Sequence, residues 1–166
     1  LNLDVVLRNQ IVPGAADDLS GFAGLLLLAR RLEGQLPDDV ELVFAATGCE
    51  ESGLGGAQAL SQDMRSRWDP ANTVVIGLDG LANGELCYYT EGEVFPVPLA
   101  PWLKDTLDSV AAADPDLASV RPFDIPVGGT DAIPFAVAGY PAVTIGAVDR
   151  SMGVPRHYHV PSDTPE

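Results

Sequence analysis

The sequence of 166 residues is long enough for one domain with a hydrophobic core. Its formal net charge of −15 argues against binding to nucleic acids or to anionic membrane surfaces. No apolar run approaches the roughly 18 residues of a membrane-spanning helix. We therefore predict a single domain over residues 1–166. The chain starts with Leu, and residues 162–166 are typical of the start of a helix, so we expect a fragment trimmed at both ends.

Hydrophobic patterning predicts strands and helices in alternation. A short strand at 3–7 precedes an amphipathic helix at 19–32, whose start is crowded by Asp17, Asp18 and Ser20. The apolar run 40–46 is typical of a strand covered on both faces of a sheet. Beyond it we expect helices at 55–65, 98–112 and 130–138, strands at 73–78, 85–90 and 142–145, an edge strand at 120–125 that contains Pro122, and a loop at 147–161. This alternation indicates an α/β sandwich.

Two adjacent glutamates, Glu50 and Glu51, follow the apolar run 40–46 and precede a glycine-rich segment. Two carboxylates at the end of a buried strand are costly, because burial and mutual repulsion both raise a carboxyl pKa. A divalent cation removes that cost, since one carboxylate binds the ion and its neighbour stays free to transfer protons. An isolated pair of this kind is more typical of two surface acids at a turn, so the interpretation depends on ligands elsewhere in the chain.

Further residues able to bind a divalent metal follow predicted strands or lie in loops. They are Asp17, Asp79, Asp131 and His159. In open α/β sheets, sites form at the carboxyl ends of strands, so we expect these side chains to converge with the glutamate pair. Carboxylates with one or two imidazoles form a ligand set suited to zinc, cobalt or manganese.

Together these motifs resemble the di-zinc aminopeptidase family, which includes bacterial leucyl aminopeptidases, glutamate carboxypeptidases and glutaminyl cyclases. The resemblance extends from residue 3 to residue 166 and implies a three-layer α/β/α sandwich with a mixed, mostly parallel sheet. The segment GAADDLSG implies that Asp17 bridges two zinc ions. The glutamate pair implies that Glu50 is the general base and Glu51 a zinc ligand. Asp79, at a strand end, and His159, in the segment YHVPSDT, match the remaining metal ligands.

One position departs from the family's pattern. The family places a His-x-Asp segment before the bridging aspartate; the corresponding stretch here is Asn2-Leu3-Asp4. Asp4 matches the catalytic aspartate that orients the histidine, whereas the carboxamide of Asn2 is a poor zinc donor. Either one of the two zinc sites has lost a ligand, so that the chain holds one ion or binds two weakly, or the true histidine lies upstream.

The implied reaction is the hydrolysis of an N-terminal peptide bond in a substrate with a free amine. A metal-activated water attacks the scissile carbonyl, and Glu50 takes its proton and passes it to the leaving amine. Tyr158 is a candidate oxyanion donor, although packing against its loop is favoured. The sequence leaves open the side-chain preference, the native metal, the oligomeric state and the compartment, for which secretion and the cytoplasm are both open.

Several of these residues also have a purely structural interpretation. Taken alone, Asp17 is more typical of a helix cap than of a metal ligand, and the family order reverses that preference. For Asp131 we favour capping of the helix at Ile133 over catalysis. For Asp163 we favour capping of a following helix, with orientation of His159 as the alternative.

Two other functions stay open. The first is another hydrolase of the same clan, such as a carboxypeptidase or a deacylase. The run GGTDA at 128–132 is also similar to the clan's tetrahedral aminopeptidases, which leaves the subfamily open. The second is a non-catalytic binding module on the peptidase fold, which Asn2 favours and the intact acidic set disfavours. A glutaminyl cyclase is less favoured, because no tryptophan-lined site accompanies the motifs.

Overall fold

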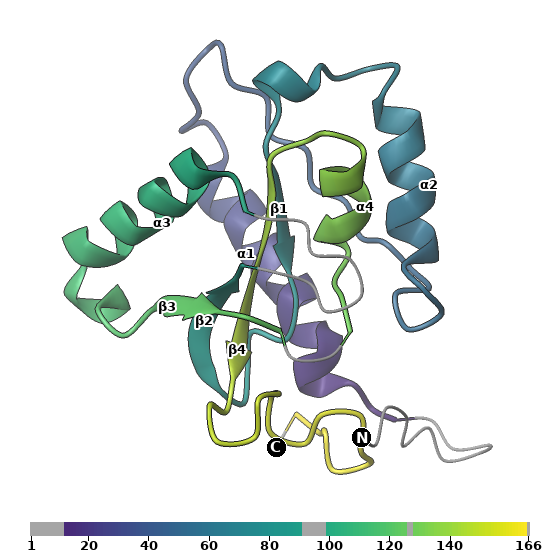
Figure 1. Ribbon diagram of the computed structural model, residues 1–166, viewed down its shortest axis with the longest axis vertical. Coiled ribbons are helices and arrows are strands. Elements are labelled where there is room, and N and C mark those ends of the chain that lie inside the picture. The colour runs from purple at the N-terminus through teal and green to yellow at the C-terminus, as the bar shows by residue number, and fades with distance from the viewer. Residues whose placement is uncertain (1–11, 91–98, 126–127, 166) are drawn as a thin grey trace.

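A mixed four-stranded sheet forms the centre of the molecule within the residues that the computed structural model describes, 12–90, 99–125 and 128–165 (Figure 1). Its strands are β1 (Val75–Leu78), β2 (Glu85–Tyr89), β3 (Arg121–Phe123) and β4 (Ala142–Val148), in the order β1-β4-β2-β3. β1 and β4 pair in parallel, as do β2 and β3, and β2 runs antiparallel to β4. The expected mixed, mostly parallel sheet is confirmed, with β3 at one edge.

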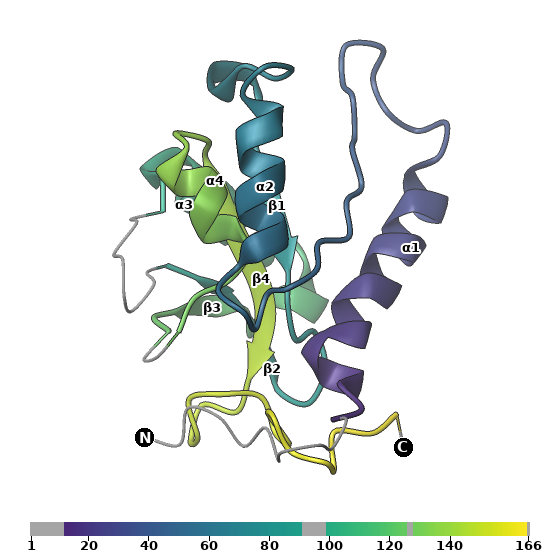
Figure 2. The same cartoon turned by 90° about the vertical axis from the view of Figure 1, so that its right-hand side faces the viewer.

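Helices cover both faces of this sheet (Figures 1 and 2). They are α1 (Ser20–Leu32), α2 (Gly55–Met64), α3 (Pro101–Ala113) and α4 (Ala132–Val137), with a π-helical turn at Ala15–Leu19 and 3-10 turns at Pro70–Asn72 and Pro115–Leu117. α2 and α4 pack on one face around Ala57 and Phe135, and α3 packs on the other around Leu103. This three-layer α/β/α sandwich matches the fold that the sequence predicts, and the elements lie close to the predicted ranges.

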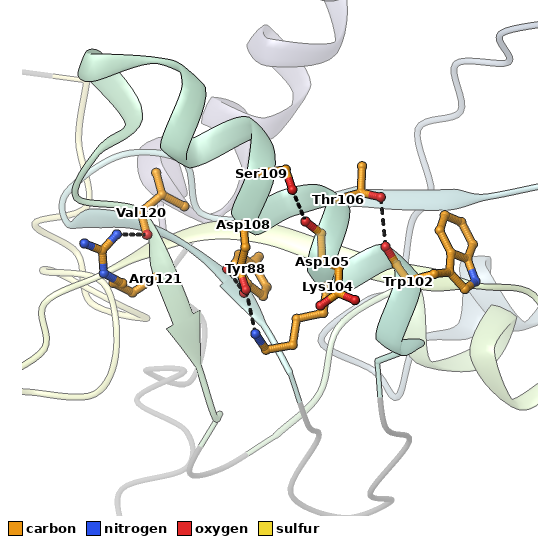
Figure 3. Close-up of polar contacts among 9 residues, drawn as sticks. All are labelled: Tyr88, Trp102, Lys104, Asp105, Thr106, Asp108, Ser109, Val120 and Arg121. Atoms are coloured by element: carbon orange, nitrogen blue, oxygen red, sulfur yellow. Dashed lines mark hydrogen bonds and ion pairs between the residues drawn. The ribbon is translucent and has the colours of Figure 1, made fainter.

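A partly buried hydrogen bond fixes α3 against β2. The hydroxyl of Tyr88, a residue only 1% exposed, donates to Asp108 Oδ1 over 2.6 Å, and Lys104 Nζ pairs with Asp108 Oδ2 at 2.6 Å (Figure 3). A buried phenol needs a partner to offset its desolvation, so the bond sets the position of the helix. The Lys104–Asp108 pair is largely exposed and contributes little to stability.

The predicted strand at 40–46 is wrong. This segment has no regular secondary structure, and it exposes Val40, Leu42, Val43 and Phe44 by 40–55%. A strand needs a neighbour to accept and donate its backbone hydrogen bonds, and no strand of the described ranges pairs with it. The segment runs between α1 and α2 in both ribbon views (Figures 1 and 2).

The helix α1 occupies the predicted range, but its apolar face is only partly covered. Phe22 is 48% exposed and Leu26 52%, whereas Gly24 and Leu78 mark where α1 contacts β1. The strand predicted at 3–7 lies outside the described residues. Among the described helices, none has the length and apolar character needed to cross a membrane.

Candidate metal centre

Three predicted ligands from distant parts of the chain meet at one point. His159 Nε2 lies 3.0 Å from Asp17 Oδ2 and 2.8 Å from Glu51 Oε1. One ligand atom from each of the three residues lies within 4.8 Å of the others. Asp17 belongs to the turn before α1, Glu51 to the turn before α2, and His159 to the loop after β4. Three loops next to different elements therefore supply one cluster, which we call the Asp17–Glu51–His159 cluster.

The imidazole of His159 fits a metal better than it fits a hydrogen bond. Its Nε2 atom is buried, yet within the described part of the chain it has no partner in hydrogen-bond geometry, although two carboxylate oxygens are near. A buried polar nitrogen left without a partner is costly. Two carboxylates and an imidazole facing a common point form a ligand set typical of zinc. The residues present therefore fit a divalent cation.

In the metal-free protein the carboxylates around His159 favour a positively charged imidazole. The carboxylate of Asp17, and then that of Glu51, raise the pKa of His159 to about 10. The ring of Tyr158 stacks on His159 with centroids 3.7 Å apart and planes inclined by 21°. Tyr158 therefore packs against the imidazole, as the favoured sequence interpretation expects.

Asp79 lies next to the cluster rather than inside it. Its side chain is not among the three whose ligand atoms lie within 4.8 Å in the described residues. Its backbone N–H donates to Ile145 O at 3.1 Å, which fixes the chain just beyond β1. Burial, followed by the charges of Asp17 and Asp18, raises the pKa of Asp79 to about 7. Asp79 thus belongs to the same acidic site.

Glu50 is half-buried beside the cluster. Burial raises the pKa of Glu50 to about 8, and the charges of Asp79 and Glu51 add to the effect.

Two residues of the site have a left-handed backbone: Cys49, just before Glu50, has φ of 60°, and His159 has φ of 58°. Non-glycine residues seldom adopt this left-handed backbone, and such strained positions gather at functional sites.

Asp18 joins two parts of the site, a role that the sequence did not reveal. Its Oδ1 atom accepts hydrogen bonds from Gly21 N and Gly80 N, both at 2.9 Å. The turn that carries Asp17 is thereby tied to the turn that follows Asp79. Gly21 is required here, because a Cβ at this position would lie 2.4 Å from the Asp18 carboxylate and 2.7 Å from Leu78 O. Burial raises the pKa of Asp18 to about 6, against the opposing hydrogen bonds from Gly80 and Gly21.

Asp131 does not cap α4, so the favoured sequence interpretation is wrong. It occupies the N-cap position, but its side chain makes no capping hydrogen bond. Its Oδ2 atom instead accepts from the hydroxyl of Thr47, while the first turn is closed by Ile133 N donating to Thr130 O. Asp131 has helical backbone angles, φ −60° and ψ −13°, whereas a capping residue is usually extended, so its carboxylate accepts from Thr47 instead of from the helix end. Nothing in the sequence marked Thr47.

Asp163 contacts the turn of Asp17 rather than His159. Its two carboxylate oxygens accept from Ala16 N and Asp17 N.

His157, two residues before His159, is exposed and pairs with Ser162 Oγ at 2.8 Å, away from the cluster. Asn2 and Asp4 lie outside the described residues, so the roles predicted for them stay predictions.

Comparison with known proteins agrees with this geometry. The model of peptidase family M28 matches residues 3–166. The alkaline phosphatase isozyme conversion protein of Escherichia coli (strain K12) is 27% identical over 98% of this chain, which spans 48% of that relative. An aminopeptidase from Aneurinibacillus sp. strain AM-1 is 30% identical with a TM-score of 0.70, over 92% of this chain and 34% of its own. The zinc aminopeptidase BSAP from Bacillus subtilis is 26% identical with a TM-score of 0.69, over 92% and 37%.

The match covers nearly all of this chain, which spans about half the length of the E. coli relative and about a third of the two aminopeptidases. The chain belongs to peptidase family M28.

Proposed function

We propose that this protein is a zinc-dependent exopeptidase that hydrolyses N-terminal peptide bonds. The observation that carries the proposal is the Asp17–Glu51–His159 cluster, with a buried imidazole nitrogen that lacks a hydrogen-bond partner in the described chain. Membership of a peptidase family and likeness to a zinc aminopeptidase support the choice of metal and reaction.

In this proposal Asp17, Glu51 and His159 hold one zinc ion. Asp79, together with Asp17, would hold a second ion. The excess of carboxylates around a single imidazole suits two cations, because each ion offsets the repulsion that otherwise raises the pKa values of Asp79 and Glu50. The Asp18 hydrogen bonds to Gly21 and Gly80 hold the two ligand turns at a fixed separation.

Zinc, when bound, lowers the pKa of a ligating water and polarises the scissile carbonyl. Glu50 moves the proton. It is adjacent to a ligand yet outside the cluster, so its carboxylate is free to accept a proton and donate it to the leaving amine. The substrate's free amine is drawn to the acidic site, which favours cleavage at an N-terminus over cleavage within a chain. Asp4 is the residue we assign to orienting an upstream metal ligand.

Turnover of aminoacyl-anilides tests this proposal. The zinc-loaded protein should cleave substrates with a free α-amine and should lose most of that activity when the amine is acetylated. Release of acetate from the N-acetylated substrates would indicate a deacylase, and cleavage only of peptides with a free C-terminal carboxylate would indicate a carboxypeptidase. Cyclisation of N-terminal glutaminyl peptides without hydrolysis would indicate a glutaminyl cyclase, and a protein that neither binds zinc nor turns over substrate would indicate a binding module.

A further inference from the structure

Asp163 is a buried carboxylate with an unusual set of partners. The residue is 1% exposed. Its Oδ1 atom accepts from Ala16 N at 2.8 Å and its Oδ2 atom from Asp17 N at 3.1 Å, across more than 140 residues of sequence. Its own backbone carbonyl accepts from Ala15 N at 3.3 Å. Three consecutive N–H groups of one turn therefore donate to a single residue.

These bonds satisfy both sides of an otherwise costly arrangement. A buried carboxylate needs donors, and backbone N–H groups outside a regular helix need acceptors. Hydrogen bonds to a charged acceptor are stronger than those between neutral groups. On the other side of the same turn, Ser20 Oγ donates to Ala16 O at 2.6 Å. The backbone that carries Asp17 is therefore held from two directions.

Asp163 also belongs to the loop that carries His159. Within this loop Val160 N donates to His157 O and Asp163 N donates to Val160 O, at 3.3 and 3.0 Å. These turns keep the three residues between His159 and Asp163 compact. Figures 1 and 2 show the loop, in yellow, beside the start of α1, in purple. The Asp163 side chain thus links the two segments whose side chains meet at His159 Nε2 and Asp17 Oδ2.

We propose that Asp163 is a positioning residue that sets the separation of Asp17 and His159, so that these two ligands are in place before the metal binds. The inference rests on the proposed function, because it assigns a metal to the cluster. Asp163 itself does not touch the metal. It fixes the backbone of one ligand relative to the other, and preorganised ligands bind a metal more tightly because less ordering accompanies binding.

The test is the zinc affinity of Asp163→Asn, measured by competition with a chromophoric chelator. The amide keeps the size of the side chain but replaces one acceptor oxygen with a donor group, so one of the two N–H groups loses its partner. We expect zinc affinity to fall by about 10- to 100-fold, as for other residues that orient metal ligands. The absorption spectrum of the cobalt-loaded variant should change as well, because the ligand geometry around the ion is altered.

A matched control is Tyr140→Phe, which removes the partly buried hydrogen bond that the hydroxyl of the buried Tyr140 donates to Trp68 O at 2.8 Å. We expect it to lower the melting temperature while keeping zinc affinity within about twofold of the parent, since its partner lies outside the metal cluster. If Asp163→Asn does not fold, Asp163→Glu takes its place. Asp163→Glu keeps both acceptor oxygens on a side chain that is one methylene longer. It should fold, and its zinc affinity should lie between that of the parent and the roughly 10- to 100-fold lower value expected for Asp163→Asn.

Either of two results would overturn the inference alone. In the first, Asp163→Asn, or Asp163→Glu where Asp163→Asn does not fold, binds zinc as tightly as the parent and its cobalt spectrum is unchanged. In the second, Tyr140→Phe loses as much zinc affinity as the Asp163 variant at the same loss of melting temperature. A parent protein that binds no zinc would overturn the proposed function and this inference together.

Discussion

The apolar residues on the two sides of β1 differ in how deeply they are buried. On one side β4 pairs with β1, and Val143, Ala147 and Val148 are at most 2% exposed. On the side of α1 and the segment 40–46, Val43 is 55% exposed and Leu27 66%. The sequences are equally apolar, so hydrophobicity alone does not make a buried strand. An apolar segment forms a buried strand only where a neighbouring strand pairs with its backbone N–H and C=O groups. The acidic site is built from turns that adjoin both regions.

The largest expected effect concerns the site itself. Replacing Glu50 with Gln should lower turnover of a free-amine substrate by about 100- to 10,000-fold, because the amide cannot accept the proton. Zinc content, measured by elemental analysis, should stay that of the parent, since Glu50 is outside the cluster. Glu33→Gln, an exposed acid at the end of α1, is the control and should retain full activity. Full activity in Glu50→Gln would refute its assignment as the base.

A matched pair of phenylalanines measures the contrast between the two regions. Phe135, on α4, is 5% exposed, and Phe22, on α1, is 48% exposed. Phe135→Ala should lower the free energy of unfolding by about 3–5 kcal/mol, because it leaves a cavity in the α2–α4 core. Phe22→Ala should cost less than about 1 kcal/mol. Urea denaturation measures both. Equal losses would show that α1 is packed as tightly as the core, which the exposed face contradicts.

Removing the metal should make stability depend on pH in a defined direction. Burial raises the pKa of Glu50 from 4.5 to about 8 and that of Asp79 from 3.8 to about 7. Between these limits the folded protein holds protons that the unfolded chain has released. The free energy of unfolding of the metal-free protein should therefore fall as the pH rises from about 4 to 8.

His159 acts in the same direction, because its pKa rises from 6.5 to about 10 and its charged form is stabilised. Melting temperatures at pH 5 and pH 8 measure the effect. Glu50→Gln should reduce the difference between these two temperatures, which would distinguish the contribution of Glu50 from general charge repulsion. Zinc should stabilise the protein more at pH 8 than at pH 5, because the ligands must lose their protons. A metal-free protein that becomes more stable towards pH 8 would contradict the charge balance of the site.

The smallest expected effect lies on the exposed side. The surface formed by α1 and residues 40–46 should bind an apolar fluorescent dye, and Leu27→Glu should reduce that binding. Stability should change by less than about 1 kcal/mol, since Leu27 is already 66% exposed. Dye fluorescence and sedimentation velocity measure the change. If Leu27→Glu unfolds the protein, the surface is buried in solution.

Local patterns were enough to predict most elements. The helical spacing of apolar residues predicted α1 and α3, and the turn at Asp79-Gly80 marked the end of β1. The run 40–46 failed because periodicity describes what a segment could bury and says nothing about which neighbour is present. Tertiary contacts therefore decide such runs.

The site shows the same division. The order of short motifs brought Asp17, Glu51 and His159 to attention, and these residues meet in the folded chain. The supporting contacts of the acidic site were missed or misassigned, since the Asp163 bond to Asp17 and the Thr47 bond to Asp131 join positions far apart in sequence. Such contacts between distant residues follow no fixed spacing, so they could not be predicted from one sequence.

An anomalous diffraction map at the zinc edge would test the metal assignment most directly. The zinc-loaded protein should give a peak about 2.0–2.2 Å from Asp17 Oδ2, a carboxylate oxygen of Glu51 and Nε2 of His159, the usual lengths for zinc bound to oxygen and nitrogen. Well-ordered side chains with no anomalous peak between them, or a peak elsewhere on the molecule, would contradict the assignment of these three residues as metal ligands.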